Sequence, residues 1–227
     1  MCESEKKWAV AVPDEAKFVV VEGIAGGGKT TVTKRIVDLW PGDVCVYREP
    51  GGTPFGEAIR KAVQSPDIPN VNERAAVLAY ASARAQLVPE IRQKINNGTS
   101  VVLDRYWSTS WAFQGQKIPS LLVWGINMIA TGGLLPDRWI FLGGDVETLL
   151  ERKRRYLKAG GINDDRWDLL PDLVEFTKRS AKKYGELARL YPKRWRNIDA
   201  TQPLDGVMGD VAKILLEIGI ELRQSNT

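Results

Sequence analysis

The stretch from Gly23 to Thr30 reads GIAGGGKT and decides the fold class of this chain. It fits the phosphate-binding pattern in which two glycines, separated by four residues, are followed by Lys and Thr. An apolar, β-branched run over residues 17–22 precedes it and is typical of a buried strand. Residues 31–39 follow it with the spacing of a helix. Strand, glycine-rich loop and helix in this order predict a nucleotide-binding loop.

The residue types in this loop suit phosphate chemistry. Glycines let the backbone curl so that its N–H groups converge on phosphate oxygens, and the following helix N-terminus adds its dipole. Lys29 offers a cation to the β- and γ-phosphates of ATP, and the Thr30 hydroxyl is placed to hold Mg²⁺. The residues expected to bind ATP here are Gly23, Gly26, Gly27, Gly28, Lys29, Thr30 and Thr31.

Composition limits the class of protein. The 227 residues, 44% of them hydrophobic, suit a single α/β domain over 1–227 with a sizeable core. The chain has no histidine and two cysteines, which excludes His-based triads, His-ligated metals and a disulfide framework. The net charge of +4 is spread along the chain, so we expect no nucleic-acid partner. No membrane-spanning run or signal peptide is evident, so we expect a cytoplasmic protein.

Five short apolar runs alternate with helical patterns along the chain. Strands are expected at residues 17–22, 44–47, 101–103, 139–142 and 196–199. Helices are expected at residues 31–40, 55–64, 71–96, 119–131, 145–158, 171–190 and 204–222. This alternation predicts a five-stranded, mainly parallel sheet with helices on both faces, the three-layer α/β arrangement of P-loop NTPases. Residues 1–16 are expected to be peripheral.

Charged side chains cluster where strands end. Asp104 follows the third strand, and a carboxylate beside a phosphate loop is suited to hold Mg²⁺ together with Thr30. The arginines near strand ends are Arg48, Arg60, Arg84 and Arg105. Their planar forks suit a second, acceptor phosphate. Tyr80 precedes Arg84 by four residues and shares its helix face, which favours a nucleobase site.

A third basic group flanks the polar loop at residues 160–168. Its members are Arg152, Arg154, Arg155 and Arg166. Phosphoryl transfer gains from cations that close over the transferred group, so we expect a lid over residues 152–168. Trp107, Trp111 and Trp167 are expected in loops that line the pocket.

From about Lys17 onward, the chain resembles the thymidylate kinase family. The resemblance rests on the loop at 23–30, REPGGT at 48–53, YASARAQLV at 80–88, DRY at 104–106, AFQG at 112–115, DR at 165–166 and IDATQP at 198–203. It implies an ATP-dependent nucleoside monophosphate kinase that converts dTMP to dTDP, with Mg²⁺, as a homodimer.

The resemblance also implies roles for single residues. Tyr80 stacks on the acceptor base, Arg84 reads a base carbonyl, and Gln114 lies at the base and sugar edge. The other residues implied at the acceptor are Glu49, Pro50, Arg60, Arg105, Thr109 and Phe113. Those implied at the donor adenine are Thr201 and Gln202. The catalytic set is Lys29, Arg105, Arg154, Arg155 and Arg166.

Two positions depart from the family pattern. Ala25 stands where family members normally carry Asp or Glu, and Phe113 stands where they carry Tyr. Both changes lie near the acceptor, so a modified or different deoxynucleoside monophosphate, such as a 5-substituted dUMP, is an alternative acceptor. A nucleotide-binding protein without transfer activity is the alternative from another class.

Overall fold

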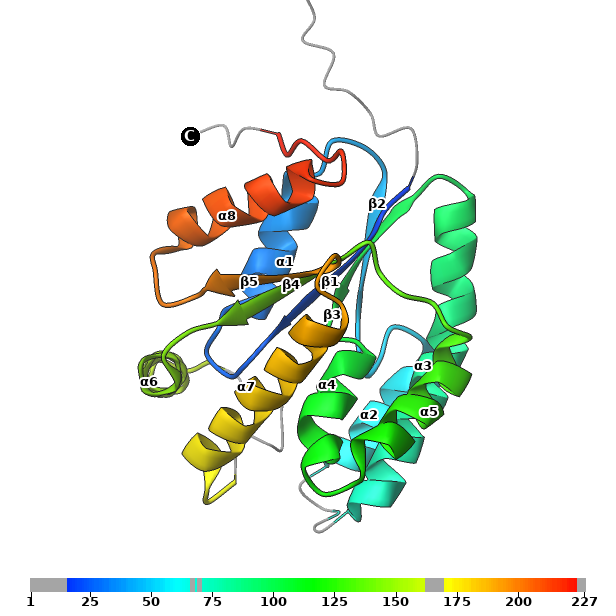
Figure 1. Ribbon diagram of the computed structural model, residues 1–227, viewed down its shortest axis with the longest axis vertical. Coiled ribbons are helices and arrows are strands. Elements are labelled where there is room, and N and C mark those ends of the chain that lie inside the picture. The colour runs from blue at the N-terminus through cyan, green and yellow to red at the C-terminus, as the bar shows by residue number, and fades with distance from the viewer. Residues whose placement is uncertain (1–15, 66–67, 69–70, 162–169, 224–227) are drawn as a thin grey trace, which may run out of the picture.

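The computed structural model describes residues 16–65, 68, 71–161 and 170–223. Its centre is a parallel sheet with the strand order β2-β3-β1-β4-β5 (Figure 1). The strands are β1 (Phe18–Gly23), β2 (Val44–Arg48), β3 (Ser100–Asp104), β4 (Arg138–Gly143) and β5 (Trp195–Asp199). All four neighbouring pairs are parallel, which confirms the predicted five-stranded sheet.

Helices cover both faces of this sheet (Figure 1). One face packs against α1 (Lys29–Asp38) and α8 (Leu204–Leu216). The other face packs against α3 (Glu73–Asn96) and α7 (Leu173–Leu190), which α4 (Trp107–Phe113) contacts in turn. The remaining helices are α2 (Pro54–Gln64), α5 (Ser120–Thr131), α6 (Val146–Lys158) and the short 3₁₀ helix η1 (Gln114–Gln116). Because β1 and β3 are buried along their whole length, their sequences are continuously apolar up to the polar residues at their ends.

The helices differ from the prediction in two places. The helix α4 was not predicted, because its sequence WSTSWAF is rich in residues with weak helix propensity. Its packing against α7 compensates for that weakness. The last helix was predicted to reach residue 222 but ends at Leu216, ahead of Gly219, whose φ of 81° does not continue a helix.

The strand order determines where a ligand can bind. The central strand β1 lies between β3 and β4, with Val21 opposite Asp104 and Gly23 opposite Leu142. The chain leaves β1 toward β2 and β3 on one side and later continues to β4 on the other. In open α/β sheets the crevice at the carboxyl ends of strands around such a reversal is the usual ligand site.

The described helices were also compared with the dimensions of a bilayer. Within the residues that the structure describes, none is both long enough and apolar enough to cross a membrane.

Candidate active site

The phosphate-binding loop follows β1 and leads directly into α1. Gly26 and Gly28 have φ angles of 78° and 80°, a region in which side-chain-bearing residues are strained. A Cβ on Gly26 would also lie 1.8 Å from the carbonyl oxygen of Leu149. Lys29 Nζ donates to the carbonyl oxygen of Ile24 at 3.0 Å, so the side chain folds back over the loop. The sequence therefore adopts the curled backbone that phosphate binding requires.

A candidate magnesium site joins this loop to the end of β3. The Thr30 hydroxyl donates to Asp104 Oδ2 at 3.3 Å. Asp104 is 6% exposed, and its Oδ1 has no hydrogen-bond partner among the described residues. No group of three or more acidic, His or Cys side chains suited to a metal occurs in the part of the chain that is described. A single carboxylate with a hydroxyl fits Mg²⁺, which keeps waters and takes its other ligands from nucleotide phosphates.

A cavity opens at the carboxyl ends of β2 and β3. Its lining residues are Arg48, Glu49, Pro50, Arg60, Gln64, Tyr80, Arg84, Arg105, Tyr106, Thr109, Ser110, Phe113 and Gln114. Arg60 Nη1 donates to the carbonyl oxygen of Pro50 at 3.2 Å, and Thr53 Oγ1 begins α2 by accepting from Gly56 N at 2.9 Å. Every acceptor-side residue expected from the sequence thus lines one cavity.

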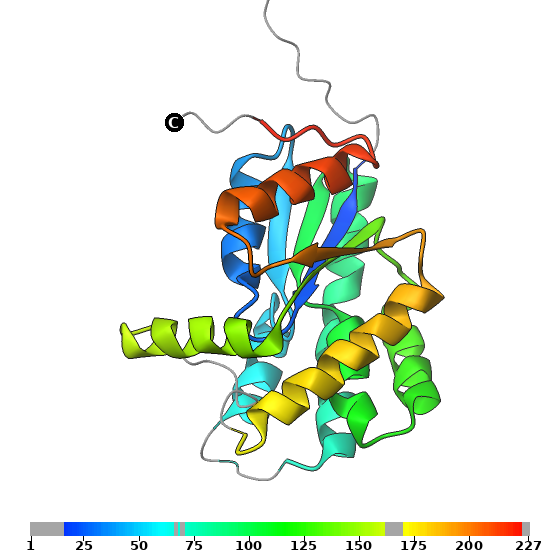
Figure 2. The same cartoon turned by 60° about the vertical axis from the view of Figure 1, so that its left-hand side comes forward.

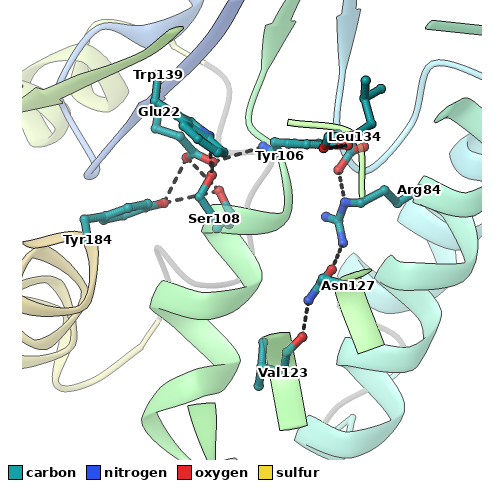
Figure 3. A network of polar contacts seen from close by, with 11 residues as sticks. Glu22, Arg84, Tyr106, Ser108, Val123, Asn127, Leu134, Trp139 and Tyr184 are labelled. Carbon is teal, nitrogen blue, oxygen red and sulfur yellow. Dashed lines mark hydrogen bonds and ion pairs between the residues drawn. The ribbon is translucent and has the colours of Figure 1, made fainter. Parts of the chain in front are cut away.

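Arg84 is fixed inside the cavity wall by two buried partners. Its Nε donates to Glu49 Oε2 at 2.6 Å, and its Nη1 donates to Asn127 Oδ1 (Figure 3). Asn127 Nδ2 in turn donates to the carbonyl oxygen of Val123 at 2.7 Å, which orients the amide. Among the described residues, hydrogen bonds engage Nε and Nη1 of Arg84, which leaves Nη2 for a ligand in the cavity that Arg84 lines.

The environment of Glu49 changes its acidity. Burial raises its pKa to about 7, although the nearby Arg84 guanidinium lowers it, and the Glu22 carboxylate adds a further upward shift. Its Oε1 is buried and has no hydrogen-bond partner among the described residues. Glu49 therefore holds Arg84 in place at the cavity wall.

The side chains expected at the base are buried yet have polar atoms to offer. Gln114 is 1% exposed, and neither atom of its amide has a hydrogen-bond partner in the described part of the chain. Tyr80 packs on Val63 and Ala76 at the cavity wall. A buried amide without partners is costly, so its presence indicates a ligand with matching polar groups.

Arg105 has the backbone conformation that stands out in this site. Its φ is 69°, and no other non-glycine residue in the described part of the chain has a positive φ. Such a conformation costs about 1 kcal/mol or more and persists where the surroundings enforce it. The guanidinium lies over the Phe113 ring, 5.5 Å from its centroid, and Phe113 packs edge to face on Phe176. Phe113 therefore supports Arg105 at the cavity.

The loop expected at the donor adenine is braced by its own contacts. Thr201 N donates to Asp199 Oδ1 at 2.9 Å, and Gln202 Nε2 donates to Asp210 Oδ2 at 2.9 Å. Arg152 donates to the carbonyl oxygens of Ala200 at 2.7 Å and Thr201 at 3.1 Å. Arg152 was expected among the lid arginines, but it stabilises this loop instead.

The lid arginines are placed less tightly. Arg154 and Arg155 are exposed on α6, which projects from the body of the molecule (Figure 2). Arg154 pairs with Glu151 at 3.5 Å, and both side chains are more than half exposed. Arg166 and Trp167 lie outside the described residues. The expectation that Trp107 and Trp111 lie in loops was wrong, since both are buried in α4 and neither lines the cavity.

Asn127 is the functional residue that sequence reasoning missed most clearly. It is an amide within the otherwise apolar helix α5, and it is fully buried. A polar residue inside such a helix could have been recognised, because buried amides need partners. The partner itself, Arg84 on another helix, could not be deduced from spacing.

Comparisons with known proteins agree with this geometry. A family model of thymidylate kinase matches residues 21–211. The thymidylate kinase of Leuconostoc citreum is 41% identical over 127 residues, which cover 53% of this chain and 59% of that protein. The one from Syntrophotalea carbinolica is 38% identical over 125 residues, covering 52% and 58%. The chain thus spans less than two thirds of those two relatives. With the thymidylate kinase of Pediococcus pentosaceus, 37% identity extends over 208 residues, or 88% of this chain and 97% of that protein.

The family model matches most of the chain, and this match agrees with the observed fold, phosphate-binding loop and cavity. The chain belongs to the thymidylate kinase family.

Proposed function

We propose that this protein transfers the γ-phosphoryl group of ATP to a phosphate oxygen of dTMP, giving ADP and dTDP. The observation that carries the proposal is the cavity at the carboxyl edge of the sheet, in which Gln114 has an unpartnered amide beside Tyr80 and Arg84. A thymine base offers both a ring face for Tyr80 and polar edges for the amide and the guanidinium.

Each side of the reaction has its own residues in this proposal. Lys29 and the loop glycines bind the donor phosphates, and Arg60 and Arg105 bind the acceptor phosphate. Thr30 and Asp104 hold Mg²⁺, which when bound neutralises charge on the donor phosphates. Arg154, Arg155 and Arg166 complete the site from a lid over residues 152–168. No general base is needed, because the acceptor phosphate is already anionic.

We also propose that two copies of the chain associate through α3 and α5. These helices pack together and expose apolar side chains, namely Leu78 (57%), Leu121 (77%), Leu122 (51%) and Ile129 (86%). Contiguous exposed apolar side chains of this kind are typical of an association surface. The charge substitution Leu121→Glu should shift the mass measured by light scattering from dimer to monomer. A parent protein whose measured mass equals that of a single chain would contradict the proposed homodimer.

We also propose that the protein acts in the cytoplasm and that residues 1–227 form one domain. Its ligands would be nucleotides, and we expect neither nucleic acid nor a membrane as a partner. The free thiol of Cys45 and the need for ATP support this setting.

The direct test is ADP formation from Mg-ATP with a panel of deoxynucleoside monophosphates that includes 5-substituted dUMP analogues. The proposal predicts the highest kcat/KM with dTMP. A higher value with another acceptor would identify the alternative substrate and make Ala25 and Phe113 specificity changes. ATP binding without acceptor-dependent ADP formation would favour the non-catalytic alternative.

A further inference from the structure

Glu22 is a fully buried carboxylate that the proposed reaction does not use. It is the last residue but one of β1 and immediately precedes the phosphate-binding loop. Its exposed fraction is 0%, and four groups donate to it. Two of them are Tyr106 N and Ser108 Oγ, which donate to Oε1 at 3.0 and 2.6 Å. Thr109 Oγ1 and Tyr184 OH donate to Oε2 at 2.8 and 3.0 Å.

These contacts gather at the start of α4. Figure 3 shows the Glu22 carboxylate between the Tyr184 hydroxyl and the first turn of that helix. The N-cap residue of α4, Tyr106, makes no side-chain cap of its own. A carboxylate at a helix N-terminus is stabilising because of the helix dipole and the unpaired N–H groups there. Glu22 therefore anchors the helix that carries Thr109 and Phe113.

The same contacts enclose the strained residue. Arg105 N donates to the carbonyl oxygen of Val21 at 3.0 Å, and the next amide, Tyr106 N, donates to Glu22 Oε1. Two consecutive amides are thus tied to two consecutive residues of β1, on either side of the φ of 69° at Arg105. A strained conformation persists only while its surroundings enforce it.

From this geometry we infer that Glu22 is the positioning residue that keeps Arg105 in its strained conformation, with its guanidinium at the acceptor phosphate. For this role, Glu22 must supply a hydrogen-bond acceptor for Tyr106 N, and its negative charge is not required. The inference rests on the proposed function, since it takes dTMP as the ligand that Arg105 meets.

Two substitutions separate the acceptor from the charge. Glu22→Gln removes the charge but keeps a carbonyl oxygen for Tyr106 N, because the hydroxyls of Thr109 and Tyr184 can rotate to accept from the new amide. Glu22→Met has a similar shape and no such acceptor. Tyr184→Phe is the matched control, because it removes one donor to Glu22 and leaves the contact with Tyr106 intact.

The experiment measures dTMP dissociation constants by titration calorimetry and KM values for both substrates. Glu22→Met should weaken dTMP binding about tenfold or more and change the KM for ATP by less than about twofold. Glu22→Gln and Tyr184→Phe should stay within about threefold of the parent protein. In an Arg105→Ala background, Glu22→Met should cause no further loss. If Glu22→Met does not fold, Glu22→Asp, whose shorter side chain draws back from Tyr106 N, replaces it.

Three results would overturn the inference. The first is unchanged dTMP affinity in Glu22→Met, and the second is an equal loss of affinity for dTMP and for ATP. The third is a further loss of dTMP affinity when Glu22→Met is added to Arg105→Ala. A parent protein that binds no dTMP contradicts the proposed function and this inference with it. A parent protein that binds dTMP, together with an unaffected Glu22→Met variant, overturns the inference alone.

Discussion

The arginines of the acceptor cavity and those of α6, which we propose to act from a lid, are held differently. Arg84 is 3% exposed and has two buried partners, whereas Arg154 on α6 is 56% exposed and pairs with Glu151 at 3.5 Å. The buried arginine has one available orientation, while the exposed one retains rotamer freedom and is screened by solvent. The acceptor side is therefore preorganised without a ligand, whereas the proposed lid arginines would have to be ordered when substrates bind.

Holding a charged side chain in a buried, fixed position costs free energy, and of Arg84 and Arg154 only Arg84 is buried in this way. Burying the charges of Glu49 and Arg84 is unfavourable unless they are paired, and these two side chains pair with each other. The exposed Arg154 on α6 avoids this cost because it remains in water.

The largest expected effect comes from the donor side. Lys29→Ala should lower kcat by about a thousandfold or more, because the cation on the transferred phosphates is lost. The melting temperature should stay within a few degrees, since Lys29 donates to a loop carbonyl and not into the core. Steady-state assays with circular dichroism would check both. Near-normal turnover would remove Lys29 from the mechanism.

Arg84→Met should reduce stability by about 3–5 kcal/mol, because it leaves the buried Glu49 without its counter-ion. The matched variant on the lid, Arg154→Met, should change stability by less than about 0.5 kcal/mol and lower kcat instead. Urea unfolding of the two variants measures the contrast. Equal stability losses would contradict the difference drawn between the two regions.

Glu49 should make stability depend on pH. Its pKa is raised from 4.5 to about 7 in the folded protein, so the folded state keeps the proton longer than the unfolded chain does. Unfolding therefore releases a proton between about pH 4.5 and pH 7, and the free energy of unfolding should fall as pH rises through this window.

The expected loss is on the order of 3 kcal/mol, since one pKa unit corresponds to about 1.4 kcal/mol. Urea unfolding at several pH values would measure it, with Glu49→Gln as the reference that cannot titrate. Parallel pH profiles for the two proteins would refute the assignment to Glu49.

The smallest effect is expected at the adenine loop. Arg152→Ala removes two hydrogen bonds to the backbone of Ala200 and Thr201, so the KM for ATP should rise a few-fold while dTMP binding is unchanged. Arg189→Ala, at an exposed position of α7, is the control and should alter neither value. A loss confined to dTMP would show that Arg152 acts elsewhere.

Much of the fold could be predicted from the sequence, because the strands alternate with helices and β1 begins with an apolar run that ends at Glu22, just before the glycine loop. The helix α4 could not, because tertiary packing and the distant Glu22 overcome the weak helix propensity of its residues.

That Arg84 and Gln114 share one cavity was predictable, because motifs mark both positions. The support behind those residues was not. Asn127 and Glu22 reach their partners across 43 and 84 or more positions of sequence, and such contacts leave no local pattern. At Arg152 the prediction was too general. Neighbouring arginines on one helix were all assigned to the lid, but Arg152 binds the Ala200 carbonyl whereas Arg154 pairs with Glu151.

The most direct test of the preformed acceptor site is a calorimetric titration of dTMP without ATP, in the parent protein and in an Arg154→Met, Arg155→Met double variant. We expect saturable binding with dissociation constants that agree within about twofold. Binding that appears only after a non-hydrolysable ATP analogue is added, or that is lost in the double variant, would contradict this expectation.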